Sequence, residues 1–242
     1  MSAWLSTLTP ATAPHLPWLV VTIAVYLGAL ALYQRWHCHP LLIPVAPAVL
    51  VIVALLLATD TPYAHYQQGV QWLSLLIGPA TVALAIPLYA QRARIRALWR
   101  PIGLALLVGC STALVSAVGI AWALGGSWET IVSLAPKSAT IPIALPLAER
   151  WGGLPALAAV GVALTGISGC MLAPWLVRSA RPLEPAVSGF ALGLTAHAIG
   201  TARALHSHPT AGAFAALAMG LNGVLTALLM PLCILALQWL QG

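Results

Sequence analysis

The chain has 242 residues, of which ten are Lys or Arg, four are Asp or Glu, and 61 % are of hydrophobic types. A soluble domain carries roughly 25 % charged residues, so the composition excludes a water-facing globular protein and requires most of the surface to face lipid. At about 20 residues per transmembrane helix, the length allows seven or eight spans. We therefore predict an all-α membrane protein in a single integral domain, 1–242.

The net charge of +6 does not indicate nucleic-acid binding, because the basic residues sit in short loops and not on one face. The largest cluster is Arg92, Arg94, Arg96 and Arg100. It is typical of a cytoplasmic loop that follows the positive-inside rule. We expect a multi-pass protein of the bacterial cytoplasmic membrane, with the lipid bilayer as its surroundings and no nucleic-acid partner.

Apolar runs follow one another along the chain and predict regular spans. Residues 1–34 contain no Lys, Arg, Asp or Glu, so the basic start of a cleavable signal peptide is missing and we expect the first run to be a retained span. The predicted spans are 17–34, 40–58, 71–90, 101–124, 154–177 and a long final helix from Pro209.

Two further segments, 127–150 and 184–203, are apolar enough for the membrane but contain polar residues and helix breakers near their centres. Irregular backbone at membrane depth must be buried in protein or line a cavity, so we predict broken helices or re-entrant hairpins. If segment 127–150 returns to the side of the membrane from which it entered, Arg178 and Arg181 lie in the cytoplasm with the arginine cluster. If the segment crosses the membrane fully, these two residues lie outside the cell. The positive-inside rule favours the hairpin.

Residues 74–90 and 133–149 share seven identities in 17 aligned positions, among them Ser, Thr and Pro, and indicate an internal repeat. A weaker similarity relates 129–140 to 184–195 through Glu129/Glu184 and Ser133/Ser188. Repeats with interrupted helices are typical of secondary transporters, whose site lies where the breaks meet.

Lys137, the only lysine in the chain, follows Pro136 within the first broken segment. A charge at membrane depth is costly and indicates a functional site, although a solvated loop tip is the alternative. Ser138 and Thr140 add hydroxyl groups beside it, and a half-helix starting here would direct its N–H groups at an anion. Glu129, at the start of this segment, could carry a coupling proton if it were buried.

The second break contains Thr195, His197, Thr201 and Arg203. His197 could serve a proton-coupled step or form a hydrogen bond between helices. Arg203 could clamp a carboxylate or mark the cytoplasmic end of its segment. Asn222, polar in an apolar helix, needs a partner and could face the same site. No catalytic or nucleotide-binding motif is found, so we expect no enzyme activity, no cofactor beyond a coupling H⁺ or Na⁺, and no metal.

Four stretches in consistent order resemble the LrgB/CidB-like family: IGPATVALAIPLY (77–89), PKSATIPIA (136–144), HAIGTARAL (197–205) and AMGLNGVLTALL (218–229). The resemblance covers roughly residues 20–240. Bacterial members are described as antiholin-like regulators of murein hydrolase export, and usually act with a smaller LrgA/CidA-like membrane partner. The plant plastidal glycolate/glycerate translocator resembles a fusion of both parts, and some bacterial members are linked to pyruvate uptake.

The resemblance implies transport of small 2-oxo or 2-hydroxy monocarboxylates. We therefore expect a secondary carrier, coupled to protons or sodium, with scaffold helices in 1–100 and a transport core in 101–242. By analogy with other carriers with broken hairpins, we expect an elevator-like movement. We also expect a homodimer, because a moving domain needs a fixed partner. The alternative is an antiholin-like regulator of autolysis that acts with an LrgA-like partner and has no transport site.

Overall fold

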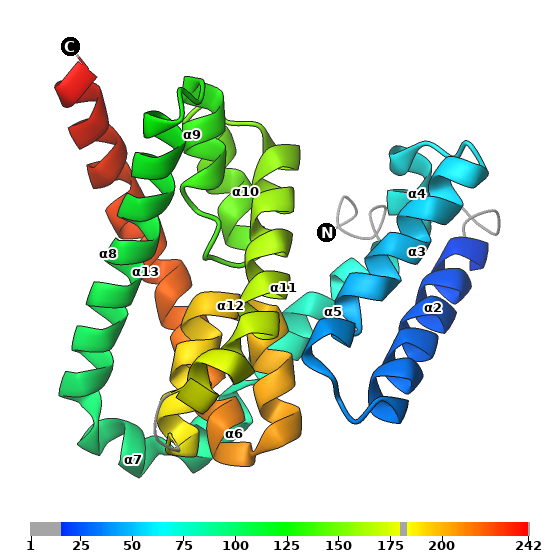
Figure 1. Ribbon diagram of the computed structural model, residues 1–242, viewed down its shortest axis with the longest axis horizontal. Coiled ribbons are helices and arrows are strands. Elements are labelled where there is room, and N and C mark those ends of the chain that lie inside the picture. The colour runs from blue at the N-terminus through cyan, green and yellow to red at the C-terminus, as the bar shows by residue number, and fades with distance from the viewer. Residues whose placement is uncertain (1–15, 180–182, 242) are drawn as a thin grey trace, which may run out of the picture. The chain divides into compact units, whose positions relative to one another are not determined.

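A computed structural model describes residues 16–179 and 183–241, and every regular element in these ranges is helical (Figure 1). This confirms the all-α class for the described part of the chain. In chain order the elements are α2 (Leu16–Arg35), η1 (Pro40–Leu42), α3 (Val45–Ala58), α4 (Tyr63–Gly69), α5 (Gln71–Ala83), α6 (Ala85–Ala90), α7 (Arg92–Ala97), α8 (Trp99–Ala123), α9 (Trp128–Leu134), α10 (Ile141–Arg150), α11 (Pro155–Ser179), α12 (Pro185–Ser207) and α13 (Pro209–Gln241).

Five described helical stretches are long and apolar enough to cross a membrane, by length and composition: Pro17–Arg35, Gln71–Ala90, Trp99–Ala123, Pro155–Ala173 and Pro209–Trp239. Each matches a span expected from hydropathy. The predicted span 40–58 is shorter as a regular helix, because its start forms the 3₁₀ turn η1 and α3 has 14 residues. That length gives about 21 Å, against roughly 30 Å of hydrocarbon. The two segments predicted to be broken are not among the five.

The chain forms two compact units, Met1–Ala83 and Leu84–Gly242. In the first, α2 packs against α3 and α4, where Trp18 meets Tyr66 edge to face at 5.7 Å and Tyr66 lies in hydrogen-bond contact with Thr22. In the second unit α6 packs on α13, and Ile95 and Leu98 pack against an apolar cluster formed by α12 and α13. The scaffold and transport roles remain predictions.

The second unit's segment 128–151 doubles back on itself. Its first residue, Trp128, donates its indole Nε1–H to the carbonyl of Trp151 at 3.1 Å. Ser133 is fully buried, donates to the carbonyl of Glu129, and accepts the backbone N–H of Leu154 at 2.7 Å. The start of α9 and the end of α10 are thereby held at one end of the unit, and residues 135–140 form the turn between them.

Ser133→Ala is expected to destabilise this segment by about 1–3 kcal/mol, because the partly buried backbone N–H of Leu154 loses its acceptor. Thermal unfolding of the purified protein in detergent measures the effect. Ser116→Ala is the matched control, since Ser116 is an exposed helical serine that donates only to its own helix. Equal melting temperatures for the two variants would contradict the assigned role of Ser133.

The helix α12 also doubles back, at His197, whose φ of 38° and ψ of −125° are not helical. A Cβ placed on Gly200 would lie 2.4 Å from the carbonyl oxygen of Leu192, eight residues earlier. In a continuous helix, eight residues span about 12 Å. The side chain of Leu192 also packs against a cluster that contains Ala204. Residues 185–196 and 198–207 are therefore two helical arms that lie side by side.

Both arms of α12 pack on the N-terminal part of α13. A Cβ on Gly193 would lie 2.1 Å from the carbonyl oxygen of Ala215, and one on Gly212 would lie 2.5 Å from Leu205 Cδ2. The first arm runs parallel to α13, since Gly189 faces Ala211 and Gly193 faces Ala215. Small residues at these positions let the backbones approach closely, as in other membrane helix pairs.

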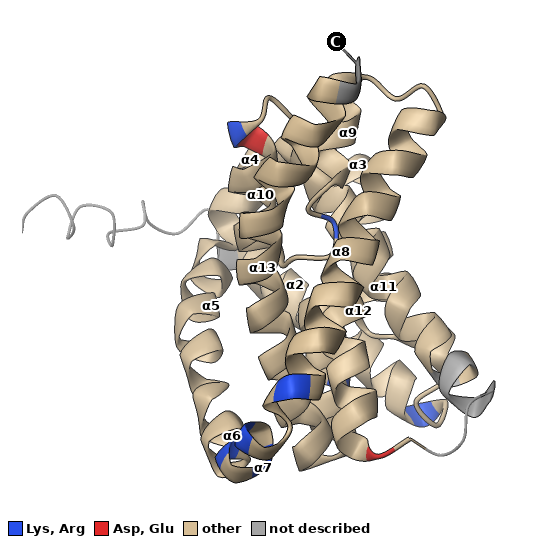
Figure 2. Cartoon of the chain, turned by 90° about the vertical axis from the view of Figure 1, so that its left-hand side faces the viewer, with Lys and Arg blue, Asp and Glu red and all other residues tan. Residues whose placement is uncertain are grey.

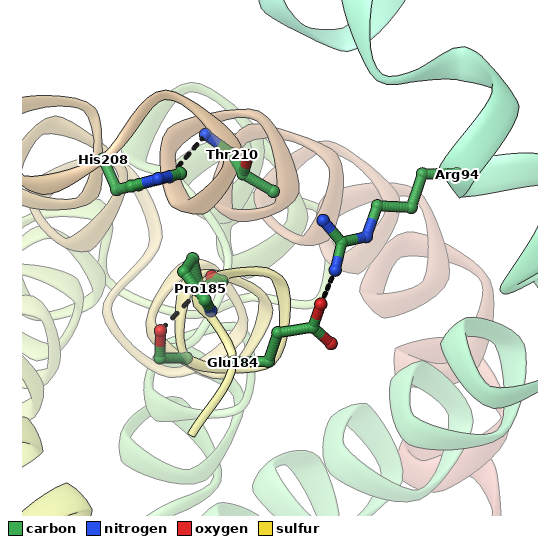
Figure 3. Close-up of polar contacts among 6 residues, drawn as sticks. Arg94, Glu184, Pro185, His208 and Thr210 are labelled. Carbon is green, nitrogen blue, oxygen red and sulfur yellow. Dashed lines mark hydrogen bonds and ion pairs between the residues drawn. The ribbon is translucent and has the colours of Figure 1, made fainter. Parts of the chain in front are cut away.

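Basic residues collect at one end of the second unit. The blue Lys and Arg positions gather at the end where α6 and α7 are labelled (Figure 2). Arg94 of α7 pairs with Glu184, the residue before α12, as Figure 3 shows. The N-terminus of α12 therefore lies at the same end as the arginine cluster. The backbone of Arg178 belongs to the last turn of α11, whereas Arg181 lies outside the described residues.

The similarity between 74–90 and 133–149 is not accompanied by a common conformation. Residues 74–83 belong to the helix α5, and the chain resumes as α6 after the single residue Leu84. The equivalent stretch from Ala135 to Thr140 forms a turn. The physical difference is that the turn contains Pro136, and that the carbonyl of the buried Ser138 accepts a hydrogen bond from Asn222. No described residue of α5 makes an equivalent contact.

Candidate functional site

The turn 135–140 carries Lys137. Its backbone N–H donates to the carbonyl of Leu134, and that of Ala139 donates to the carbonyl of Pro136, so the reversal is closed by its own hydrogen bonds. The Lys137 side chain is half-buried and has no hydrogen bond or ion pair with any residue in the described ranges. Its ammonium group is consequently free to receive an anionic ligand.

Asn222 of α13 holds this turn in place. Its side chain is 1 % exposed, and its Nδ2 donates to the carbonyl of Ser138 at 2.8 Å. The Oδ1 atom is buried and has no partner among the described residues. A buried acceptor without a donor costs free energy, so this atom marks a position where a water molecule or a ligand hydrogen could bind.

His197 forms the second reversal and is 4 % exposed. Its Nε2 lies 2.9 Å from the carbonyl oxygen of Val162 in α11. A carbonyl only accepts, so Nε2 must carry the proton, and Nδ1 of the neutral ring is left as an acceptor. No described residue bonds to Nδ1. Thr201 donates to the carbonyl of His197 at 2.8 Å and secures the reversal one turn later.

The two reversals meet at one level of the second unit. Lys137 Cβ lies 3.8 Å from the Cβ position of Gly161, and His197 bonds to the next residue, Val162. On α13, Asn222 contacts the first reversal and Met219, one turn earlier, lies 3.7 Å from the hydroxyl of Thr201 in the second. Figure 1 shows α9 and α10 beside one end of α11 and α12 beside the other.

Six of the predicted site residues lie at this meeting point: Lys137, Ser138, Thr140, His197, Thr201 and Asn222. Thr140 precedes α10 and makes no side-chain capping bond. Thr195 and Arg203 lie elsewhere, in a groove between α11 and the arms of α12. Glu129 is exposed, so the condition set for its role as a buried proton carrier is not met.

Sequence reasoning did not single out the residues of α11 that receive both reversals, Gly161, Val162 and Gly166. A Cβ on Gly166 would lie 2.5 Å from His197 Cε1 and 2.8 Å from its Nε2. The glycines of α11 were the available signal, but their partners are more than 20 residues away and leave no local pattern.

Gly166→Ala is expected to displace the His197 ring and to destabilise the protein by about 1–3 kcal/mol through overpacking. The melting temperature of the purified variant in detergent measures this cost. Gly119→Ala in α8 is the control, because its Cβ would meet nothing within 4 Å. A Gly166→Ala protein as stable as the control would contradict the close packing of His197 on α11.

The sequence model of the LrgB-like family matches residues 22–236, nearly the whole described chain. The chain belongs to the LrgB-like family. The predicted family is thus confirmed, and the five apolar helices make this member a multi-pass membrane protein.

Relatives match along most of their length. The protein YxaC of Bacillus subtilis is 36 % identical over 216 residues, which cover 89 % of this chain and 94 % of YxaC. YwbG of the same species is 38 % identical over 211 residues, which cover 86 % of this chain and 92 % of YwbG. The antiholin-like protein LrgB of Bacillus mycoides is 30 % identical to this chain over 219 residues, which cover 90 % of this chain and 95 % of that protein. No solved structure matches the chain.

Proposed function

We propose that this protein is a secondary carrier of small monocarboxylate anions, such as glycolate, glycerate, lactate or pyruvate. The observation that supports it best is the meeting of two chain reversals at adjacent residues of α11, with the unpaired Lys137 on one and His197 on the other. Broken helices that meet inside a membrane bundle are the usual site of such carriers.

The order of elements supports an inverted repeat of re-entrant hairpins. The helices α8 and α11 have 25 residues each, and each is followed by a segment that doubles back. The two helices begin at Trp99 and Pro155, which are 56 positions apart. In the weak sequence similarity, Glu129 aligns with Glu184, which is 55 positions later. The spacing of the helices therefore agrees with the spacing of the similar segments. With the arginine end in the cytoplasm, one hairpin enters from each side of the membrane.

Lys137 would bind the substrate carboxylate, because an ammonium group without a described ion-pair partner is a strong donor to it. The hydroxyls of Ser138 and Thr140, the Oδ1 of Asn222 and the hydroxyl of Thr201 would surround the rest of a small anion. His197 could take up a coupling proton at Nδ1 while Nε2–H keeps its bond to Val162. Coupling to sodium is the alternative.

Alternating access would come from movement of the second compact unit relative to the first, in an elevator-like cycle within a homodimer. The support is the division of the chain into two compact units, with both reversals in one of them. Uptake that persists after a disulfide bond has locked the two units together would contradict this movement.

A second function is favoured by the names of relatives. Several curated relatives, at 29–30 % identity over about 90 % of this chain, are called antiholin-like protein LrgB. These names support an antiholin-like regulator of murein hydrolase export, acting with an LrgA/CidA-like partner, better than they support a carrier. Such a regulator would depend on its helix-packing surfaces and not on Lys137.

Uptake of labelled glycolate and labelled pyruvate into liposomes that contain the purified protein tests the carrier function. We expect saturable uptake that is driven by an inwardly directed proton gradient, and none in protein-free liposomes. Well-folded protein that takes up neither anion, with or without a proton gradient or a sodium gradient, would contradict the proposal.

An autolysis assay separates the two functions. A strain lacking the gene is complemented with wild-type protein or with Lys137→Ala, and the rate of detergent-induced lysis is followed. If both restore the same lysis rate while only wild type transports, regulation does not depend on the transport site. If lysis follows transport, regulation is a consequence of carrying the anion.

A further inference from the structure

A second polar site lies in the groove that contains Arg203, away from the meeting point of the reversals. The groove has a volume of about 500 Å³ and is formed by α11, both arms of α12 and the first turn of α13. It lies within the second unit, and the small residues Gly169 and Gly189 are among those that line it. Its volume is in the range of known ligand sites, about 300–1,000 Å³.

The charge in this groove is uncompensated. Arg203 is the one charged residue among the described residues that line it. Its Nη1 donates to the carbonyl of Cys170 at 2.6 Å, and no carboxylate pairs with it in the described ranges. A guanidinium has five N–H donors, so one backbone bond fixes its position and leaves most of its donors for an anion.

The remaining lining divides into hydroxyls and apolar walls. Ser188, Thr195 and Ser207 each donate their hydroxyl hydrogen to a carbonyl of their own arm, which leaves the oxygen atoms as acceptors. Leu172 and Leu192 supply apolar surface. A matching ligand would therefore carry a negative charge, hydroxyl hydrogens and a hydrocarbon chain.

We infer that this groove binds an anionic glycerophospholipid, with its phosphate on Arg203 and an acyl chain along Leu172 and Leu192. Charge complementarity selects the anionic class, since the groove holds a cation without a described counter-ion. Ser188 lies one turn from Glu184, and so near the end of the unit that carries the arginine cluster. Basic residues near a membrane surface attract anionic lipids.

Native mass spectrometry of the purified protein tests this inference by titration with phosphatidylglycerol and, separately, phosphatidylcholine. Wild type is expected to bind the first phosphatidylglycerol about fivefold more tightly than phosphatidylcholine. Arg203→Gln should abolish this preference, while Arg150→Gln, an exposed arginine at the end of α10, should keep it. Equal preference in wild type and Arg203→Gln would overturn the inference.

Two further measurements keep the result interpretable. Ala191→Trp fills the groove from an exposed position and leaves Arg203 in place, so it should weaken phosphatidylglycerol binding even if Arg203→Gln is poorly folded. Inorganic phosphate in excess should not displace the lipid. If phosphate alone competes fully, or if Ala191→Trp binds phosphatidylglycerol as wild type does, the groove is not a lipid site.

Discussion

Replacing Lys137 with Ala is expected to lower the rate of saturable glycolate uptake into liposomes by about 30-fold or more. Removing one partner of a desolvated charge pair costs roughly 2–5 kcal/mol, and about 2 kcal/mol corresponds to that factor. Because Lys137 has no hydrogen bond or ion pair with described residues, its loss leaves no buried group without a partner. The melting temperature should therefore change little.

Two variants sharpen this prediction. Lys137→Arg keeps the charge but not the compact ammonium, and should retain part of the uptake. Arg150→Gln removes an exposed positive charge outside the site and should leave uptake unchanged. A folded Lys137→Ala protein that transports at the wild-type rate would remove the basis for a site at the first reversal.

Replacing Gly193 with Ala is expected to cause the largest loss of stability, about 3 kcal/mol or more. The added Cβ would lie 2.1 Å from the carbonyl oxygen of Ala215 and 2.6 Å from its Cα. Both atoms belong to the backbone of α13, so the helices must separate, whereas overpacking against a movable side chain typically costs 1–3 kcal/mol. Unfolding in detergent, followed by intrinsic fluorescence, measures the loss.

Gly220→Ala is the matched control for this prediction, since it lies in α13 and its Cβ would meet nothing within 4 Å. The same substitution there should stabilise the helix by about 0.5–1 kcal/mol. The two glycine variants should therefore shift the melting temperature in opposite directions. A Gly193→Ala protein that melts at or above the Gly220→Ala protein would contradict the close approach of α12 and α13.

The positions of the helices were predictable because hydropathy and breakers are local properties. The runs that begin near Pro17, Gln71 and Pro209 are helices in the structure, and the polar stretches around Pro136 and His197 contain the reversals. Sequence predicted either a proton-coupled step or a hydrogen bond between helices for His197. The structure shows its Nε2 bonded to the carbonyl of Val162 in α11, and the proton-coupled step stays a prediction.

The contacts between segments could not be predicted. Gly161 and Val162 receive both reversals, yet in the sequence they are ordinary small and apolar residues of a span. Arg203 was grouped with His197 because they are six positions apart. Since the chain folds back at His197 and the Arg203 side chain reaches Cys170, the two residues face different parts of α11.

The most direct test of the carrier proposal is counterflow in liposomes that contain the purified protein. The liposomes are loaded with excess unlabelled glycolate, and a trace of labelled glycolate is added outside. A carrier that alternates around one site should accumulate label transiently above its equilibrium level, and Lys137→Ala should not. Label that only rises to equilibrium in wild type, at a rate that does not saturate, would identify a pore and contradict the proposal.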